Sequence, residues 1–172
     1  NMLKLEGQHR NYLRSLGLLN SSIEGNLYKT TPKNYVKRRL ISHILSKKYN
    51  LAGIPGFFQE EDFKWCFSKY RGFFVPVLSD DGLIQGLSIH LDKPFNNTED
   101  IWFSSSNKIN GTSSKNYIMK SNITPNTSSV ILTDNFILGH LIKDALNLPV
   151  ISFQNISNSY MILNSIQNTN IR

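Results

Sequence analysis

The 172-residue sequence predicts a mixed α/β (α+β) fold. Apolar residues recur at helical spacing near the N-terminus, a β-hairpin signal lies mid-chain, and buried-type strands alternate with helices in the last third. We therefore expect a helical N-terminal lead-in over residues 1–50, a β-rich segment with an antiparallel hairpin over 51–128, and a β-α-β-α unit over 129–172. With 40% hydrophobic residues, the three segments are expected to share one compact globular unit.

Three helices are predicted in the lead-in. The first covers residues 5–17, and the second is a short helix capped by Asn20 or Ser21. The third covers residues 34–48 and presents one apolar stripe, which we expect to face the core. The stripe consists of Val36, Leu40, Ile41, Ile44 and Leu45.

The middle of the chain predicts strands and a long polar loop. The expected strands cover residues 64–67, 73–78, 83–91 and 101–104, and the sequence Ser79-Asp80-Asp81-Gly82 predicts the hairpin turn. In strand 83–91, polar and apolar residues alternate, so we expect a buried face and an open face that carries Ser88 and His90. Residues 105–129, rich in serine, form either a mobile loop or a binding loop.

The last third predicts a small parallel sheet flanked by helices. Its buried-type strands cover residues 129–133 and 149–154. A helix over 135–146, capped by Asp134 or Thr133, connects them. A final helix over 159–166 is expected to start from a cap at Ser157 or Asn158.

Positive charge is concentrated in the first third of the chain. Residues 1–50 carry ten Lys and Arg and two Glu, whereas residues 51–172 carry nine Lys and Arg and ten Asp and Glu. Such asymmetry is typical of a lobe that faces a polyanion, so DNA or RNA is the expected partner. A solvated helix face is the alternative interpretation.

Other classes of protein are disfavoured by composition. No apolar run approaches the roughly 20 residues that span a bilayer, so no membrane association is expected. Without a signal-peptide pattern at the start, a cytoplasmic location is the expectation. The single cysteine, Cys66, forms no internal disulfide and is expected to be a buried thiol.

Several phrases resemble a known family. They are HRNYLRSLGL, IPGFF, YRGFFVPV, DDGLIQGLSIHLD, WFSSSNKINGTSS and SVILTDN, between about residue 9 and residue 153. Together they resemble a domain-of-unknown-function family in primase-like replication proteins of plasmids, phages and integrative elements of Gram-positive bacteria. The resemblance implies that residues 129–172 form a reduced Toprim-like α/β unit.

Toprim-like units hold magnesium with a glutamate that precedes a glycine and with a later Asp-x-Asp pair. By resemblance, Asp134 occupies the glutamate position, but Asn135 follows it, and residues 150–172 contain no Asp or Glu. We therefore expect no independent catalysis and no cofactor. Asp134 remains the candidate catalytic residue and magnesium ligand of the alternative, in which a partner completes the site.

Ten residues are candidates for contact with nucleic acid. Basic side chains neutralise phosphates, and the small polar residues of the WFSSSNKINGTSS phrase donate hydrogen bonds to them. His90 stands where the family often has a basic residue. The candidates are Lys37, Arg38, Arg39, Lys47, Lys48, His90, Ser105, Asn107, Lys108 and Ser113.

The favoured function is a nucleic-acid-binding or replication-accessory protein of a mobile element that does not catalyse a reaction alone. One alternative is a partner-dependent, magnesium-using nucleotidyl transferase or nuclease fragment. Another is a protein-interaction module that regulates a replication protein such as a primase or helicase.

Overall fold

A computed structural model describes residues 2–154 and 159–167, and the predicted caps Ser157 and Asn158 lie outside these ranges. The fold is mixed α+β, as predicted. The chain divides into two compact units. Unit 1 comprises residues 1–9, 29–74 and 87–115, and unit 2 comprises residues 10–28, 75–86 and 116–172. Each unit is assembled from separate stretches of sequence, whereas the predicted segments are consecutive.

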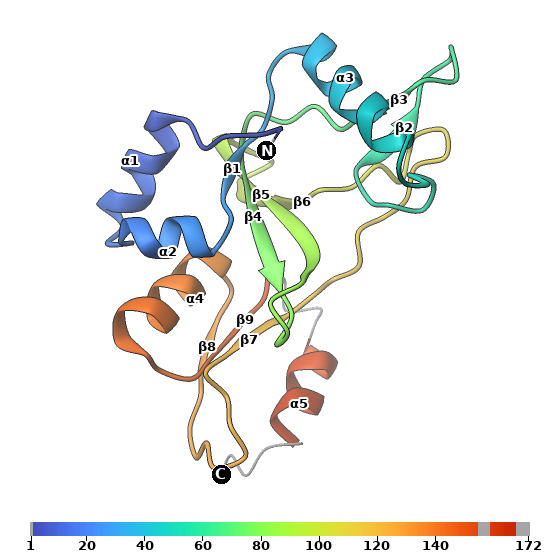
Figure 1. The fold of residues 1–172 in the computed structure, drawn as a ribbon. Coiled ribbons are helices and arrows are strands. Elements are labelled where there is room, and N and C mark those ends of the chain that lie inside the picture. The colour runs from blue at the N-terminus through green and yellow to red at the C-terminus, as the bar shows by residue number, and fades with distance from the viewer. Residues whose placement is uncertain (1, 155–158, 168–172) are drawn as a thin grey trace. The chain divides into compact units, whose positions relative to one another are not determined.

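The described elements follow one another along the chain (Figure 1). In order they are α1 (Gly7–Ser15), α2 (Asn20–Gly25), β1 (Lys29–Thr30), α3 (Tyr35–Ser46), β2 (Phe57–Gln59), β3 (Trp65–Phe67), β4 (Gly72–Leu78), β5 (Ile84–Phe95), β6 (Thr98–Trp102), β7 (Met119–Ser121), β8 (Ile131–Thr133), α4 (Phe136–Leu141), the π-helical turn η1 (Ile142–Leu146), β9 (Val150–Ser152) and α5 (Ser159–Gln167).

The predicted hairpin is the centre of a four-stranded sheet with the order β1-β4-β5-β6. Gly82 allows its turn because φ is +74° there, and the Ser79 N–H donates to the Leu83 carbonyl (2.8 Å). The prediction that β5 has an open face is wrong, because Ser88 and His90 are both buried. The His90 ring packs beside Phe73 and its Nδ1 lies 3.0 Å from Asp100 Oδ1 on β6.

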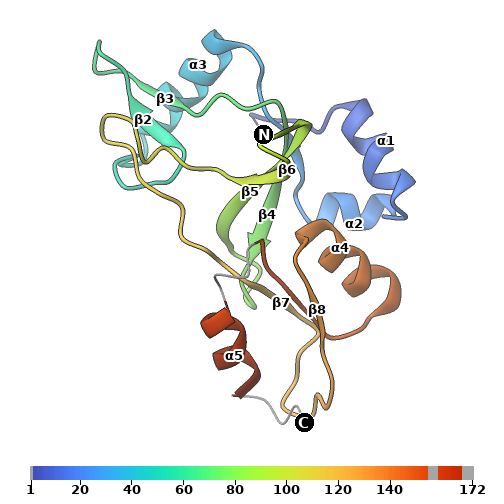
Figure 2. The ribbon, with the colours of Figure 1, turned by 180° about the vertical axis from the view of Figure 1, so that it is seen from behind.

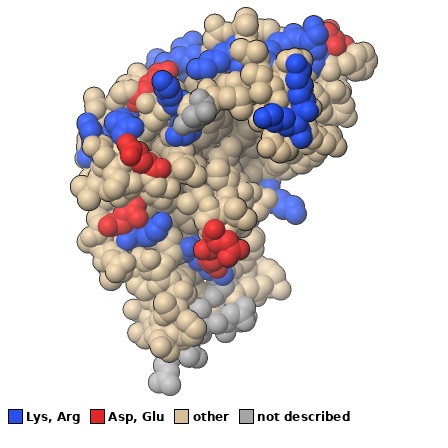
Figure 3. Space-filling view, in the orientation of Figure 1, with Lys and Arg blue, Asp and Glu red and all other residues tan. Residues whose placement is uncertain are grey.

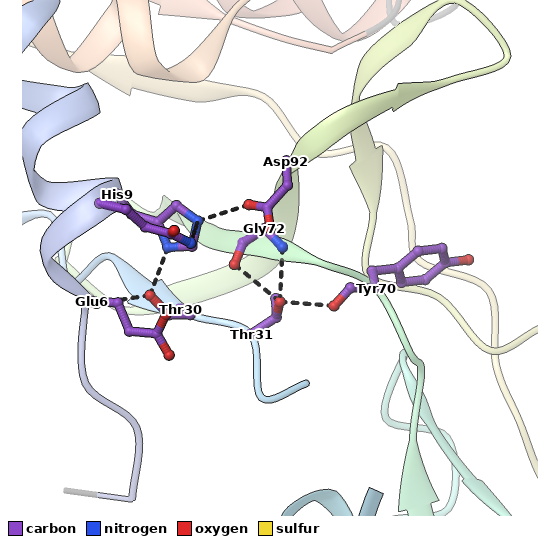
Figure 4. A network of polar contacts seen from close by, with 8 residues as sticks. Glu6, His9, Thr30, Thr31, Tyr70, Gly72 and Asp92 are labelled. Atoms are coloured by element: carbon purple, nitrogen blue, oxygen red, sulfur yellow. Dashed lines mark hydrogen bonds and ion pairs between the residues drawn. The ribbon is translucent and has the colours of Figure 1, made fainter. Parts of the chain in front are cut away.

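A polar network ties the N-terminal segment of unit 1 to this sheet (Figure 4). His9 Nδ1 lies 2.7 Å from the Thr30 hydroxyl oxygen, and His9 Nε2 lies 2.8 Å from Asp92 Oδ1. Thr31 donates its hydroxyl to the Tyr70 carbonyl (2.8 Å), and the Gly72 N–H donates to that hydroxyl oxygen (3.0 Å). These contacts satisfy polar groups that burial would otherwise leave without partners.

Helix α3 packs on β3, which pairs antiparallel with β2, and β2 is not among the strands that the sequence predicts. Ile41 belongs to the unit 1 core with Phe67 and Phe103. Cys66 is buried as expected, and burial raises the pKa of its thiol.

The predicted stripe of α3 does not face the core as a whole. Val36, Leu40 and Ile44 are exposed, whereas Arg38 and Ser42 are buried beside Ile41. The helix therefore carries apolar residues on two faces, and the packing of β3 covers the face with Ile41.

Unit 2 contains the three-stranded sheet β7-β9-β8. Strands β8 and β9 are parallel, as predicted, and β7 adds an antiparallel partner. Strand β9 is fully buried, but Ile131 and Leu132 of the edge strand β8 are exposed, so the prediction of a buried strand there is wrong. Helix α4 is capped by Asn135, which accepts from the Leu138 N–H (2.9 Å), and not by Asp134 or Thr133.

A buried polar group lies in the core of unit 2. His140 of α4 is fully buried, and its Nδ1 is hydrogen-bonded to the Tyr28 hydroxyl. Burial lowers the pKa of His140 to about 3, with a smaller contribution from Lys143. Burial and the nearby Asp144 carboxylate raise the pKa of Tyr28.

Candidate nucleic-acid interface

The predicted basic residues of α3 have three different environments. The Asn34 side chain accepts from the Lys37 N–H (3.2 Å) and starts the helix, which places Lys37 in its first turn with the ammonium exposed. Lys47 and Lys48 follow the last turn, and both are exposed. No ion pair of these three lysines is present among the described residues. Their charges are therefore not compensated within the described part of the chain.

Arg38 has a structural role in the fold. Its side chain is buried, and Nη1 donates to the carbonyls of Pro32 (3.4 Å) and Lys33 (3.0 Å). These carbonyls belong to the segment that leads into α3. The guanidinium therefore fixes the backbone directly before the helix. Arg38, a predicted contact for nucleic acid, is therefore not exposed to one.

Arg39 pairs with acidic residues of the β2–β3 turn. Its Nη2 lies 2.6 Å from Asp62 Oδ2, and its Nη1 lies 3.3 Å from Glu60 Oε2. The Tyr35 hydroxyl accepts from Arg39 Nη1 (2.9 Å) and donates to Glu60 Oε2 (2.6 Å). The hydrogen bond from Arg39 lowers the pKa of Asp62. The charge of Arg39 is therefore largely balanced at its own position.

Hydrogen bonds of Ser105 hold the serine-rich loop closed. The Ser105 hydroxyl donates to the Phe57 carbonyl (2.7 Å) and accepts from the Thr112 N–H (3.0 Å), and Ser105 is buried. A side chain at Gly111 would meet the Ser105 carbonyl oxygen, because an added Cβ would lie only 1.9 Å from it. Gly111 thus allows the backbone at residue 111 to pack closely against the backbone at Ser105. Ser105 has a structural role.

Two residues of this loop share a hollow with α3. Asn107 and Lys108 line it together with Tyr35 and Arg39, and its volume is about 530 Å³. The Gln59 N–H donates to the Ile109 carbonyl (2.9 Å), which fixes the loop beside β2, as Figure 2 shows. The hollow is also lined by acidic residues, namely Glu60, Glu61 and Asp62.

Two further candidates differ in exposure. Ser113 is exposed in the segment that follows the loop. His90 is buried between Phe73 and Asp100, so its ring has little surface to offer a phosphate. Of the ten candidates, Arg38, His90 and Ser105 are buried by the fold, and the others keep exposed or partly exposed side chains.

The excess charge of the whole chain belongs to unit 1. This unit contains fourteen Lys and Arg and seven Asp and Glu, whereas unit 2 contains five of each kind. Figure 3 shows Lys and Arg side chains gathered on the surface over the part of unit 1 where α3 and the β2–β3 hairpin lie. A positive surface of this kind attracts polyanions.

Asp134 lies in unit 2 and is exposed, directly before the α4 cap. Asp144, the next carboxylate along the chain, accepts from Asn26 Nδ2 (2.7 Å) and lies 3.8 Å from Lys143 Nζ. Within residues 2–154 and 159–167, no three His, Cys, Asp or Glu side chains converge in a metal-binding group.

Sequence reasoning missed two residues near the interface, Tyr35 and Phe63. Tyr35 connects Arg39 to Glu60, and Phe63 is exposed at the tip of the β2–β3 hairpin. The position of Phe63 between Asp62 and Lys64 is a signal, because an aromatic residue among charged residues in a turn is seldom a core residue.

No protein-family model and no curated protein matches the chain. None of the helices in the described ranges is long and apolar enough to cross a bilayer.

Proposed function

We propose that the chain binds nucleic acid through unit 1 and acts as a replication-accessory protein of a mobile element. The observation that supports this proposal is the charge distribution, since unit 1 has a net charge of +7 and unit 2 has none. DNA and RNA are the common cellular polyanions that such a surface attracts. The resemblance of residues 9–153 to Toprim-like replication proteins favours the same class and a cytoplasmic location.

The proposed function is binding without independent catalysis. By resemblance, Asp134 and Asn135 stand where the family has glutamate and glycine, and residues 150–172 contain no Asp or Glu that could supply the later Asp-x-Asp pair. The chain is therefore proposed to be a reduced Toprim-like domain that holds a nucleic acid for other proteins to process.

The proposed contacts are the exposed members of the predicted set. They are Lys37, Lys47, Lys48, Asn107, Lys108 and Ser113. Lysine binds phosphate as a point charge on a flexible stem, so these contacts carry little information about base sequence. Binding is expected to weaken steeply with salt, because each neutralised phosphate releases counterions.

A charge-reversed triple variant, Lys37→Glu/Lys47→Glu/Lys48→Glu, tests the proposal. We expect its affinity for a fluorescently labelled oligonucleotide, measured by anisotropy at about 50–100 mM salt, to fall at least about tenfold. The slope of log affinity against log salt concentration should become shallower by about 2–3, one for each lost phosphate contact.

The matched control is Arg10→Glu/Arg14→Glu/Lys120→Glu, which removes the same amount of positive charge from unit 2. Circular dichroism establishes that both variants fold. Equal losses of affinity in the two variants would show that net charge alone, and not the α3 surface, determines binding.

A further inference from the structure

A row of apolar side chains on α3 faces solvent. Val36, Leu40 and Ile44 are 69%, 55% and 40% exposed, while Ile41 on the neighbouring side of the helix packs into the core. Their spacing of four residues places them in one line along the helix. Single exposed apolar residues are common, but a continuous row is typical of a surface that another molecule covers.

Phe63 provides a second exposed apolar surface at the tip of the β2–β3 hairpin. Its side chain is 79% exposed, although its φ of +58° lies in the left-handed region that bulky residues avoid. The turn is regular, with the Phe63 N–H donating to the Glu60 carbonyl (2.9 Å). An aromatic residue that stays exposed at a strained position indicates that the ring itself has a use.

These two surfaces border one groove within unit 1. Val36 and Leu40 form one wall, Phe63 and Trp65 form the other, and the groove has a volume of about 610 Å³. No Asp or Glu is among the described residues that line it. We name it the α3 groove.

The charges around the α3 groove are unevenly balanced. Inside it, Arg39 and Lys64 lie 2.6 Å and 3.4 Å from Asp62 Oδ2, so their charges are compensated. Around α3, Lys37, Lys47 and Lys48 have no such partner in the described part of the chain. The groove therefore has an apolar centre and a basic margin.

We propose that the α3 groove docks an amphipathic helix of a partner protein, with an apolar face that packs on Leu40 and Phe63 and acidic flanks that meet the lysines of the margin. Apolar anchors spaced along a helix fit a groove of this kind, and acidic flanks match its margin. A single-stranded nucleic acid fits less well. Phe63 and Trp65 offer aromatic faces on one wall only, Val36 and Leu40 on the other wall offer none, and phosphates would have to displace Asp62 from Arg39.

The test is a selection of random peptides of about 16 residues, long enough for a helix, displayed on phage against the immobilised full chain. We expect the enriched peptides to carry apolar residues at helical spacing and a net negative charge. Their synthetic forms should bind the Leu40→Glu and Phe63→Asn variants at least about tenfold more weakly than the parent.

Asparagine tolerates the left-handed conformation, so Phe63→Asn removes the ring and keeps the turn. The control is Leu19→Glu, which changes a leucine of unit 2 that is 65% exposed and should leave binding intact. The proposal is wrong if no peptide is enriched, if the enriched peptides are basic, or if they bind all variants equally. It is also wrong if Leu40→Glu and Phe63→Asn weaken binding of a thymidine oligonucleotide at least about tenfold, because the groove would then accept unpaired bases.

Discussion

At the scale of single residues, Phe63 combines a large exposed ring with a backbone conformation that favours glycine or asparagine. Because the ring contributes little burial, removing it should relieve strain at small cost. We expect Phe63→Asn to raise the free energy of unfolding by about 1 kcal/mol in urea titrations. A loss of stability would mean that the ring packs more tightly than its exposure indicates.

His140 should make the stability of unit 2 depend on pH. The unfolded chain protonates this imidazole near the ordinary pKa of 6.5, whereas the folded chain does so only at about 3. Between these values the unfolded state binds more protons, so acidification favours unfolding, by at most about 1.4 kcal/mol per pH unit.

The His140→Asn variant isolates this contribution. Asparagine removes the titrating ring and keeps an acceptor for the Tyr28 hydroxyl. The variant should be less stable at neutral pH, yet its unfolding free energy should fall less steeply between pH 6.5 and 3. If the two proteins have the same slope, His140 is not the group responsible.

At the scale of elements, the Ser105–Thr112 loop depends on the absence of a side chain at position 111. We expect Gly111→Ala to lower the free energy of unfolding by about 1–3 kcal/mol, because its Cβ would meet the Ser105 carbonyl oxygen. Gly25→Ala is the matched control, since no atom lies within 4 Å of an added Cβ in α2. That change should be neutral or stabilise by up to about 1 kcal/mol. Equal effects would contradict the role of Gly111.

Local patterns predicted most elements of this fold. Helical spacing identified α3, and the Ser79–Gly82 turn identified the β4–β5 hairpin. Periodicity could not determine which flank of α3 is buried, because Val36 and Leu40 on one flank and Ile41 on the other are all apolar. Packing against strand β3 makes that choice, and Arg38 on the buried side donates to the carbonyls of residues 32 and 33.

Strand pairing explains the other differences. Strand β2 lies in a stretch rich in glycine and proline, and its identity depends on pairing with β3. The apolar sequence of β8 predicts a buried strand, but its position at the sheet edge leaves Ile131 and Leu132 exposed. For the candidate interface, residue type alone could not separate exposed Lys37 and Lys108 from buried His90 and Ser105.

At the scale of the whole molecule, the two units differ in charge far more than in size. Unit 1 holds the entire excess of positive charge, although its residues come from three separate stretches of sequence. Under the proposed function, polyanion binding belongs to unit 1, and the partner helix proposed for the α3 groove would engage the same unit. Competition between an acidic peptide and an oligonucleotide is then expected only if both contact Lys37, Lys47 or Lys48.

The central claim is that the lysines of unit 1 contact nucleic acid, and lysine acetylation footprinting tests it most directly. The full chain is acetylated with and without an oligonucleotide of about 20 nucleotides, and modification is read by mass spectrometry. We predict that Lys37, Lys47, Lys48 and Lys108 become less reactive when the oligonucleotide is bound, while Lys120 and Lys143 of unit 2 do not change. Protection at Lys120 and Lys143 without protection at the α3 lysines would contradict the account.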